Sequence, residues 1–295
     1  MELGARLRGR LDRYDAVLVQ RGGYPMGPAW IVRALERFSG RVVLDLDDNV
    51  FATSPRLATK SRAARWLYGD HQARYLLGRA DVVVVSTAEL ANSLPGRRAD
   101  IILPTVPDVA NYPTVTPRDE LPIQVGWIGN AGNLIYLDPL REVFERMRRE
   151  QLAELEVLSP EPWHGPATHR LWRRSDEVSD IARYDVGIMP LPDTTYTRSK
   201  AGFKLLMYMG VGSAVIAGPV GVNEELVRRS GAGILADTPE EWDAALRQLA
   251  SDRPRREAMG RAGQRFIRSY ADMGAQADTL AGALRGAARG ARRPG

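Results

Sequence analysis

The sequence has no cysteine and only three histidines among its 295 residues, His71, His164 and His169. The absence of cysteine excludes disulfide bonds and thiolate chemistry, and it suits a reducing cytoplasm. Three histidines are too few for a histidine-rich metal site. The spacing of His164 and His169 does not place both on one face of a helix. We therefore expect His164 and His169 to lie in a polar loop rather than to bind a metal.

Long apolar runs are also missing. No stretch approaches the length of a membrane span, and the first residues, MELGARLRGRLDRYD, lack the apolar core of a signal peptide. The net charge of +5 comes mostly from arginine and suits anionic partners such as nucleotide phosphates. No nucleic-acid-binding motif accompanies that charge. We predict a cytoplasmic protein that does not bind nucleic acid, with peripheral contact at the inner membrane face as an open alternative.

Short apolar runs alternate with helix-length segments along the whole chain, which predicts an α/β fold with parallel sheets. Their continuous Val, Ile and Leu content suits strands that are covered on both faces. The expected strands are residues 16–20, 42–45, 82–86, 101–103, 123–128, 155–158, 186–191, 214–217 and 233–236. The expected helices of the second half are residues 136–149, 176–181, 239–249, 255–269 and 272–285.

A proline-bearing polar segment, VTPRDELP at residues 115–122, predicts a linker between two domains. We expect one Rossmann-like domain over residues 1–117, a second over residues 118–271, and a C-terminal helix with a basic tail over residues 272–295. Two such domains leave a cleft onto which the carboxyl ends of both sheets open. Ligands of α/β proteins bind at those ends.

Residues 184–227 are the most informative segment, YDVGIMPLPDTTYTRSKAGFKLLMYMGVGSAVIAGPVGVNEELV. A strand leads into a polar loop with Lys200, Gly202 opens a helix that carries Lys204, and a second buried strand follows. A lysine in the first turn of a helix opposes the helix dipole, so its position is better explained if an anion binds beside it. The alternative is that both lysines are simply exposed on a loop.

The motif GWIGNAGN at residues 126–133 joins a strand to a helix through small residues. Gly129 and Gly132 lack the Cβ atoms that would keep a pyrophosphate away from the backbone N–H groups. The motif therefore indicates a phosphate-binding turn, although glycines after strands also form ordinary turns.

Two motifs follow strands of the first domain. DLDD at residues 45–48 carries Asp47 and Asp48, which could bind a divalent metal, cap the next helix or contact an acceptor hydroxyl. QRGGYPMGP at residues 20–28 carries Arg21, which could meet an acceptor or a donor phosphate. Its glycines and prolines could equally serve only to shape the turn.

Taken together, these motifs resemble the family 4 group of retaining GT-B glycosyltransferases over nearly the whole chain. YDVGIMPLPD, KAGFKLLMYM and AVIAGPVGVNEELV resemble the donor region of that family, and QVGWIGNAGN resembles the loop that opens its second domain. VLVQRGGYPMGP, VVLDLDD, ADVVVVSTAELA and ILPTVPDVANY resemble its first domain. The resemblance is strongest to bacterial members that make capsule, exopolysaccharide or glycosylated natural products.

The resemblance implies a GT-B fold, in which two Rossmann-like domains face each other across a cleft. The N-terminal domain would hold the acceptor, and the C-terminal domain would hold a nucleotide-diphosphate sugar. It further implies sugar transfer with retention of configuration, with no metal and no cofactor beyond the nucleotide-sugar co-substrate. The acceptor would be a saccharide, a lipid-linked molecule or a natural product.

The resemblance also assigns roles to individual residues. The catalytic residues would be Lys204 and Lys200. The donor phosphate would be bound by Gly129, Asn130, Gly132, Asn133 and Lys204. The donor sugar and nucleoside would lie against Pro190, Leu191, Ser199, Ala201, Gly202, Phe203 and Met207. The acceptor side would include Arg21, Gly22, Asp47 and Asp48.

Three features depart from the family pattern. Ser199 and Met207 stand where the family commonly has two glutamates, which contact the donor sugar and the ribose hydroxyls. Residues 129–137 carry no charge, so the usual Arg and Lys near the first phosphate loop are missing. The first domain is shortened by an opening strand–helix–strand unit. Its sheet should therefore have an exposed edge. We expect either a mis-assigned start or a homo- or hetero-oligomer that covers this edge.

These departures keep two other functions open. A non-catalytic auxiliary subunit of glycosyltransferase type would activate a partner enzyme and would not need the two glutamates. A nucleotide-sugar epimerase would need ionisable groups near the sugar, and the nearest carboxylate in the donor loop is Asp193.

Overall fold

The computed structural model describes residues 11, 13–20, 35–52 and 70–290, and the chain divides into two compact units. Unit 1 comprises Met1–Thr105, Arg198–Ala201 and Met273–Gly295. Unit 2 comprises Val106–Thr197 and Gly202–Asp272. Each unit contains a parallel sheet with helices on both faces, which confirms the predicted α/β class.

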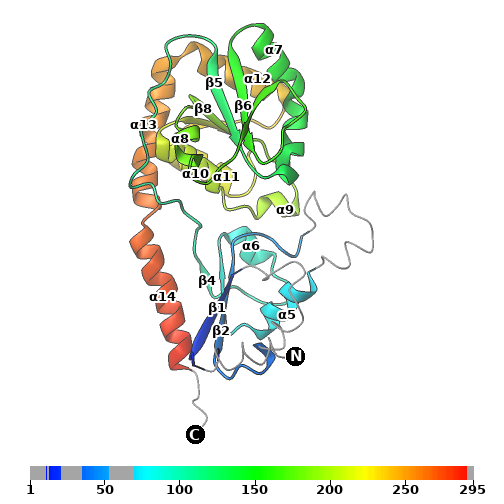
Figure 1. Cartoon of the computed structure of the whole chain (residues 1–295), viewed down its shortest axis with the longest axis vertical. Coiled ribbons are helices and arrows are strands. Elements are labelled where there is room, and N and C mark those ends of the chain that lie inside the picture. The colour runs from blue at the N-terminus through cyan, green and yellow to red at the C-terminus, as the bar shows by residue number, and fades with distance from the viewer. Residues whose placement is uncertain (1–10, 12, 21–34, 53–69, 291–295) are drawn as a thin grey trace. The chain divides into compact units, whose positions relative to one another are not determined.

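The sheet of unit 1 has four parallel strands in the order β1-β2-β3-β4. One face packs against α5 (His71–Arg79) and α6 (Ala88–Asn92), and the other packs against α14 (Met273–Arg289), as Figure 1 shows. Among the described residues β1 pairs with β2 alone, so its other side is the expected sheet edge. The strands are β1 (Ala16–Gln20), β2 (Arg41–Leu46), β3 (Val82–Val85) and β4 (Ile101–Ile102).

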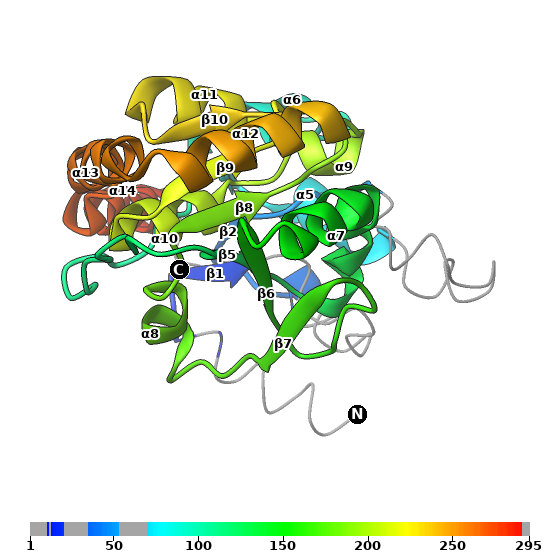
Figure 2. The ribbon, with the colours of Figure 1, turned by 90° about the horizontal axis from the view of Figure 1, so that it is seen from above.

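The sheet of unit 2 has six parallel strands in the order β10-β9-β8-β5-β6-β7. Helices cover both faces of the sheet (Figures 1 and 2), and a hydrophobic cluster lies on each face. The strands are β5 (Ile123–Ile128), β6 (Ala153–Ser159), β7 (Ala167–Leu171), β8 (Val186–Met189), β9 (Ala214–Ala217) and β10 (Gly233–Leu235). One face is covered by the 3-10 helix η1 (Ala131–Leu140), α7 (Arg141–Arg149) and α12 (Pro239–Ser251). The other is covered by α8 (Glu177–Ile181), α10 (Phe203–Val211), α11 (Val222–Ser230) and α13 (Arg253–Tyr270).

The structure differs from the sequence prediction at three places in unit 2, and His169, expected in a polar loop, lies on β7. The strand β7 was missed, because its sequence ATHRL is that of a polar, largely exposed edge strand without an apolar run. The helix expected over residues 136–149 is α-helical only from Arg141, because Pro139 lacks the N–H group that an α-helical turn needs. The short helix α9 (Thr195–Arg198) also lies in the segment expected to be a loop.

The bounds of the two units differ from the expected continuous ranges. Residues 106–117 group with unit 2, because the N–H of Val115 donates to the carbonyl of Val211 at 2.7 Å and the side chains of Val109 and Tyr112 pack against its core. Arg198–Ala201 groups with unit 1, as does the chain from Met273 onward. No helix among residues 70–290 or the shorter described stretches is long and apolar enough to cross a membrane.

Candidate functional site

The carboxyl edge of the unit 2 sheet brings the predicted phosphate turn beside the donor segment. β5 and β8 are neighbours, with Gly126 opposite Gly187 in the ladder, so the turns that follow them leave the sheet side by side. The N–H of Gly129 donates to the carbonyl of Leu158 at 3.2 Å, and that of Asn133 donates to the carbonyl of Asn130 at 2.9 Å. A Cβ at Gly129 would lie 2.4 Å from the ring of Trp127, so packing also explains this glycine.

The turns after three neighbouring strands meet at this edge. Tyr136 of η1, Leu191 after β8 and Val220 after β9 form one small apolar cluster. Pro190 and Leu191, expected beside the nucleoside, are buried within or next to it. The cluster fixes these turns relative to one another.

A buried tyrosine ties α10 to the phosphate turn. The N–H of Ile128, the last residue of β5, donates to the hydroxyl of Tyr208 at 3.0 Å. Burial raises the pKa of Tyr208 above its ordinary value, despite the opposing N–H of Ile128, so the phenol is neutral at physiological pH. Because Gly129 follows Ile128, the Tyr208 hydrogen bond sets the distance between α10 and this turn.

Gly202 begins α10 in the way the sequence predicts. Its φ of +67° is left-handed, and a Cβ there would lie 2.6 Å from the side chain of Leu226. Ala201, the residue before Gly202, belongs to unit 1, and Gly202 belongs to unit 2. Phe203 and Lys204 follow Gly202 in the first turn of α10. Both the left-handed backbone and the contact with Leu226 therefore require glycine at position 202.

Lys204 is paired with a carboxylate that sequence reasoning missed. Its Nζ donates to Oε1 of Glu177 at 3.0 Å and lies 3.5 Å from Sδ of Met207. It also lies 5.3 Å from the centre of the Phe203 ring. The lysine side chain is 29% exposed and the glutamate side chain 19% exposed, so both groups are accessible from solvent. Met207 itself is buried in the core.

Glu177 is held in place by its own surroundings. The indole N–H of Trp172 donates to the same oxygen, Oε1, at 3.1 Å. Helix α8, which carries Glu177, is anchored by Arg170, whose Nε lies 2.9 Å from Glu156 and 3.5 Å from Asp180. Burial raises the pKa of Asp180, with Arg170 opposing that shift. The available sequence signal was a glutamate at the start of the expected helix 176–181, after a strand that was not foreseen.

In unit 1, Ser199 is held by two residues of the neighbouring loops. Asn49 donates from Nδ2 to the hydroxyl of Ser199 at 3.1 Å, and the hydroxyl of Thr87 donates to the carbonyl of Ser199 at 3.4 Å. Ser199 is 1% exposed. Asn49, which was not foreseen, also accepts from the N–H groups of Phe51 and Ala52, both at 3.1 Å.

The predicted acceptor-side residues are only partly described. Asp47 and Asp48 follow β2 directly, two positions and one position before Asn49, and the carbonyl of Asp47 accepts from the hydroxyl of Ser86 at 3.2 Å. Arg21 and Gly22 lie outside the described residues. Lys200 groups with unit 1, whereas Lys204 groups with unit 2.

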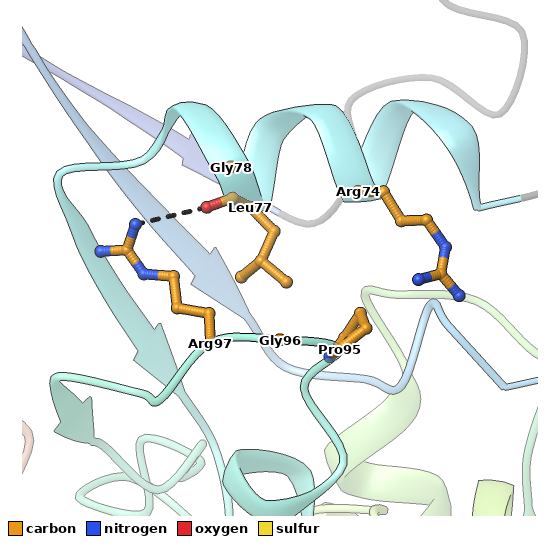
Figure 3. Close-up of a pocket in the computed structure, with 6 residues that line it drawn as sticks. All are labelled: Arg74, Leu77, Gly78, Pro95, Gly96 and Arg97. Atoms are coloured by element: carbon orange, nitrogen blue, oxygen red, sulfur yellow. Dashed lines mark hydrogen bonds between the residues drawn. The ribbon is translucent and has the colours of Figure 1, made fainter.

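Two other features bear on ligand binding. Within the described ranges, no three or more His, Asp or Glu side chains come together as a metal site would require. A cavity of about 350 Å³ lies in unit 1 between α5 and the loop before Arg97 (Figure 3). Arg97 donates across it to the carbonyl of Leu77 at 3.4 Å, and Arg74 is paired with Asp70 at 2.6 Å. None of the predicted site residues lines this cavity.

Comparison with known proteins identifies the fold. No family model and no curated protein sequence matches the chain. Sucrose-phosphate synthase from Thermosynechococcus elongatus is similar with a TM-score of 0.72 and 14% identity, over 96% of this chain and 77% of that protein. HepE from Anabaena, solved with UDP and glucose, is similar with a TM-score of 0.69 and 14% identity, over 96% and 81%.

TarM from S. aureus is similar with a TM-score of 0.70 and 10% identity, over 95% of this chain, which spans 58% of TarM. These proteins are GT-B glycosyltransferases, and the chain therefore has the GT-B fold.

Proposed function

We propose that the protein is a glycosyltransferase that moves a sugar from a nucleotide-diphosphate sugar to an acceptor, with retention of configuration and without a metal. The observation that carries the proposal is the position of Lys204, partly exposed in the first turn of α10. That helix is tied through Tyr208 to the residue before Gly129. The Glu177 carboxylate already offsets the helix dipole, and the partly exposed ammonium group keeps donors for a second anion. The co-crystallised UDP and glucose of HepE support a nucleotide-sugar as that anion.

In the proposed reaction, the bond between the anomeric carbon and the diphosphate oxygen breaks as a bond to the acceptor oxygen forms on the same face. The acceptor proton passes to the departing phosphate oxygen, and a nucleoside diphosphate leaves. The ammonium group has three donors, so Lys204 can contact the diphosphate while it keeps Glu177. Lys204 stabilises the negative charge that develops on the leaving group.

The remaining predicted residues have supporting roles in this proposal. The backbone of residues 129–133 contacts the diphosphate, Ala201, Gly202 and Phe203 lie along the sugar, and Pro190 and Leu191 lie beside the nucleoside. Asp47 and Asp48 face the acceptor, which we propose is a saccharide, a lipid-linked molecule or a natural product in the cytoplasm.

A non-catalytic auxiliary subunit is the second candidate, and two observations favour it. The hydroxyl of Ser199 is bonded to Asn49, and Met207 is buried in the core. Neither position supplies the carboxylate common in the family. Such a subunit would bind a nucleotide-sugar without transferring or hydrolysing it.

The test is thermal unfolding with UDP, GDP, dTDP and their sugars. A true ligand at a hundred times its Kd should stabilise the folded protein by about 2.7 kcal/mol. The Lys204→Ala variant should lose that response, whereas Arg261→Ala, which removes an exposed cation on α13, should keep it. If no nucleotide stabilises the protein, the donor site is wrong. If Lys204→Ala responds fully, Lys204 is not part of it.

Turnover separates the two candidates. Release of free nucleoside diphosphate, by transfer or by slow hydrolysis, supports the enzyme. Binding without release supports the auxiliary subunit.

A further inference from the structure

We propose that Glu177 supplies the carboxylate that position 207 lacks, that it binds the ribose hydroxyls of the nucleotide, and that it makes the site selective for ribonucleoside diphosphates. The inference rests on the proposed nucleotide site. It assigns a specificity-determining residue to that site and predicts that a deoxyribose donor such as a dTDP-sugar binds more weakly.

The first step is proximity. A thioether such as that of Met207 is only a weak acceptor and cannot replace a carboxylate as partner of a hydroxyl. The ammonium group of Lys204 lies 3.5 Å from Sδ of Met207 and 3.0 Å from Oε1 of Glu177. The Glu177 carboxylate therefore contacts the same ammonium group as Met207, the residue that stands where the family has a glutamate. Glu177 belongs to α8, whereas Met207 belongs to α10.

The second step is the remaining bonding capacity of the carboxylate. Oε1 of Glu177 accepts from Lys204 and from the indole of Trp172. An ionised carboxylate has about four acceptor positions on its two oxygens, so two hydroxyl donors can still be accommodated. A ribose presents two adjacent hydroxyls, and hydrogen bonds to a charged acceptor are stronger than those between neutral groups.

The third step is preorganisation. Trp172 orients the carboxylate, and Arg170 joins α8 to β6 through Glu156 and Asp180. The Glu177 side chain is 19% exposed, so it is partly buried but still accessible from solvent. A partly exposed acceptor held from two sides needs little reordering to bind a ligand.

The experiment measures the Kd of UDP and GDP, and of their 2′-deoxy counterparts, for the wild-type chain. One lost hydrogen bond to a carboxylate should weaken deoxynucleotide binding by about tenfold to a hundredfold. This comparison needs no variant. If both sugars bind equally well, the role of Glu177 is refuted while the nucleotide site stands. If no nucleotide binds, the proposed function fails and this inference fails with it.

The variant Glu177→Gln identifies the residue responsible. It should bind deoxynucleotides as the wild type does and bind ribonucleotides only about as well as deoxynucleotides. Glu257→Gln, which disturbs ion pairs with Arg253 and Arg261 on α13, is the matched control and should keep the preference. A Glu177→Gln protein that weakens both classes equally would show that the residue only positions Lys204. One that keeps the preference would also overturn the proposal. If Glu177→Gln does not fold, Glu177→Ala serves instead, and an unchanged preference in that variant would overturn the proposal.

Discussion

Asp81 is a carboxylate with three partners at the start of β3. Its oxygens accept from Arg41 at 2.5 Å, from the N–H of Val42 at 2.8 Å and from Arg79 at 3.3 Å. Burial acts to raise the pKa of Asp81, but the Val42 N–H and the Arg41 guanidinium outweigh burial, and the net shift is downward. The charged form of Asp81 therefore stabilises the folded state of unit 1.

This downward shift predicts a pH dependence that Asp81→Asn should remove. The pKa of Asp81 is lower in the folded than in the unfolded chain. The carboxylate therefore stabilises the folded state at pH values above its unfolded pKa of about 4. That stabilisation is lost as the pH falls through the folded pKa. We expect the variant to be less stable by about 1 kcal/mol at pH 7. Urea unfolding at pH 7 and pH 3 checks this, and a difference that does not shrink at low pH would contradict it.

At the same scale, one half of the Lys204–Glu177 pair was predictable and the other was not. Lys204 could be found because its position in the first turn of a helix is readable from local sequence. Glu177 is 27 residues upstream. Only the packing of α8 beside α10 brings it near, and no local pattern encodes that contact. Asn49 was missed for the same reason, since its partner Ser199 is 150 residues away.

Among whole elements, the buried strands were predictable and the polar ones were not. β5 and β9 have the expected bounds, because continuous apolar runs in parallel sheets have few alternative placements. β7 has no such run, and its strand conformation is set by the ladder with β6. The start of α7 was misplaced because the face that includes Leu137 and Leu140 stays buried through η1 as well, so periodicity alone did not mark the change.

The N-terminus of α12 gives a prediction at the element scale. Thr238 accepts from the N–H of Glu241 at 3.3 Å, and Glu241 accepts in return from the N–H groups of Thr238 and Asp237. Thr238→Ala should lower the free energy of unfolding by about 1 kcal/mol, because one helix donor loses its partner.

The control is Thr279→Ala, which removes an exposed hydroxyl from the interior of α14. We expect a change of no more than about 0.5 kcal/mol there. Guanidinium unfolding midpoints measure both variants, and equal midpoints for the two would rule out the cap as a source of stability.

For the whole molecule, the course of the chain matters more than any single element. The chain leaves unit 1 after Thr105, builds unit 2 apart from the short segment Arg198–Ala201, and returns to unit 1 at Met273 as the helix α14. Leu280, Leu284 and Ala287 of α14 pack on Val43 and Val84 of the unit 1 sheet. Unit 1 therefore depends on its last helix for one of its two covered faces, while the two sheets keep separate cores.

This dependence predicts that a charge in α14 will weaken one unit and spare the other. Ala287→Asp places a carboxylate against Val43 and Val84, and the burial of an unpaired charge should cost unit 1 about 3 kcal/mol or more. In hydrogen exchange followed by mass spectrometry, amides of β2 and β3 should exchange faster, and those of β5 and β8 should be unchanged. The matched control Gly282→Ala lies on the same helix with open space around its Cβ, and should stabilise by about 0.5–1 kcal/mol. Equal acceleration in both sheets would mean that the units unfold together, and no acceleration would mean that α14 does not cover the sheet of unit 1.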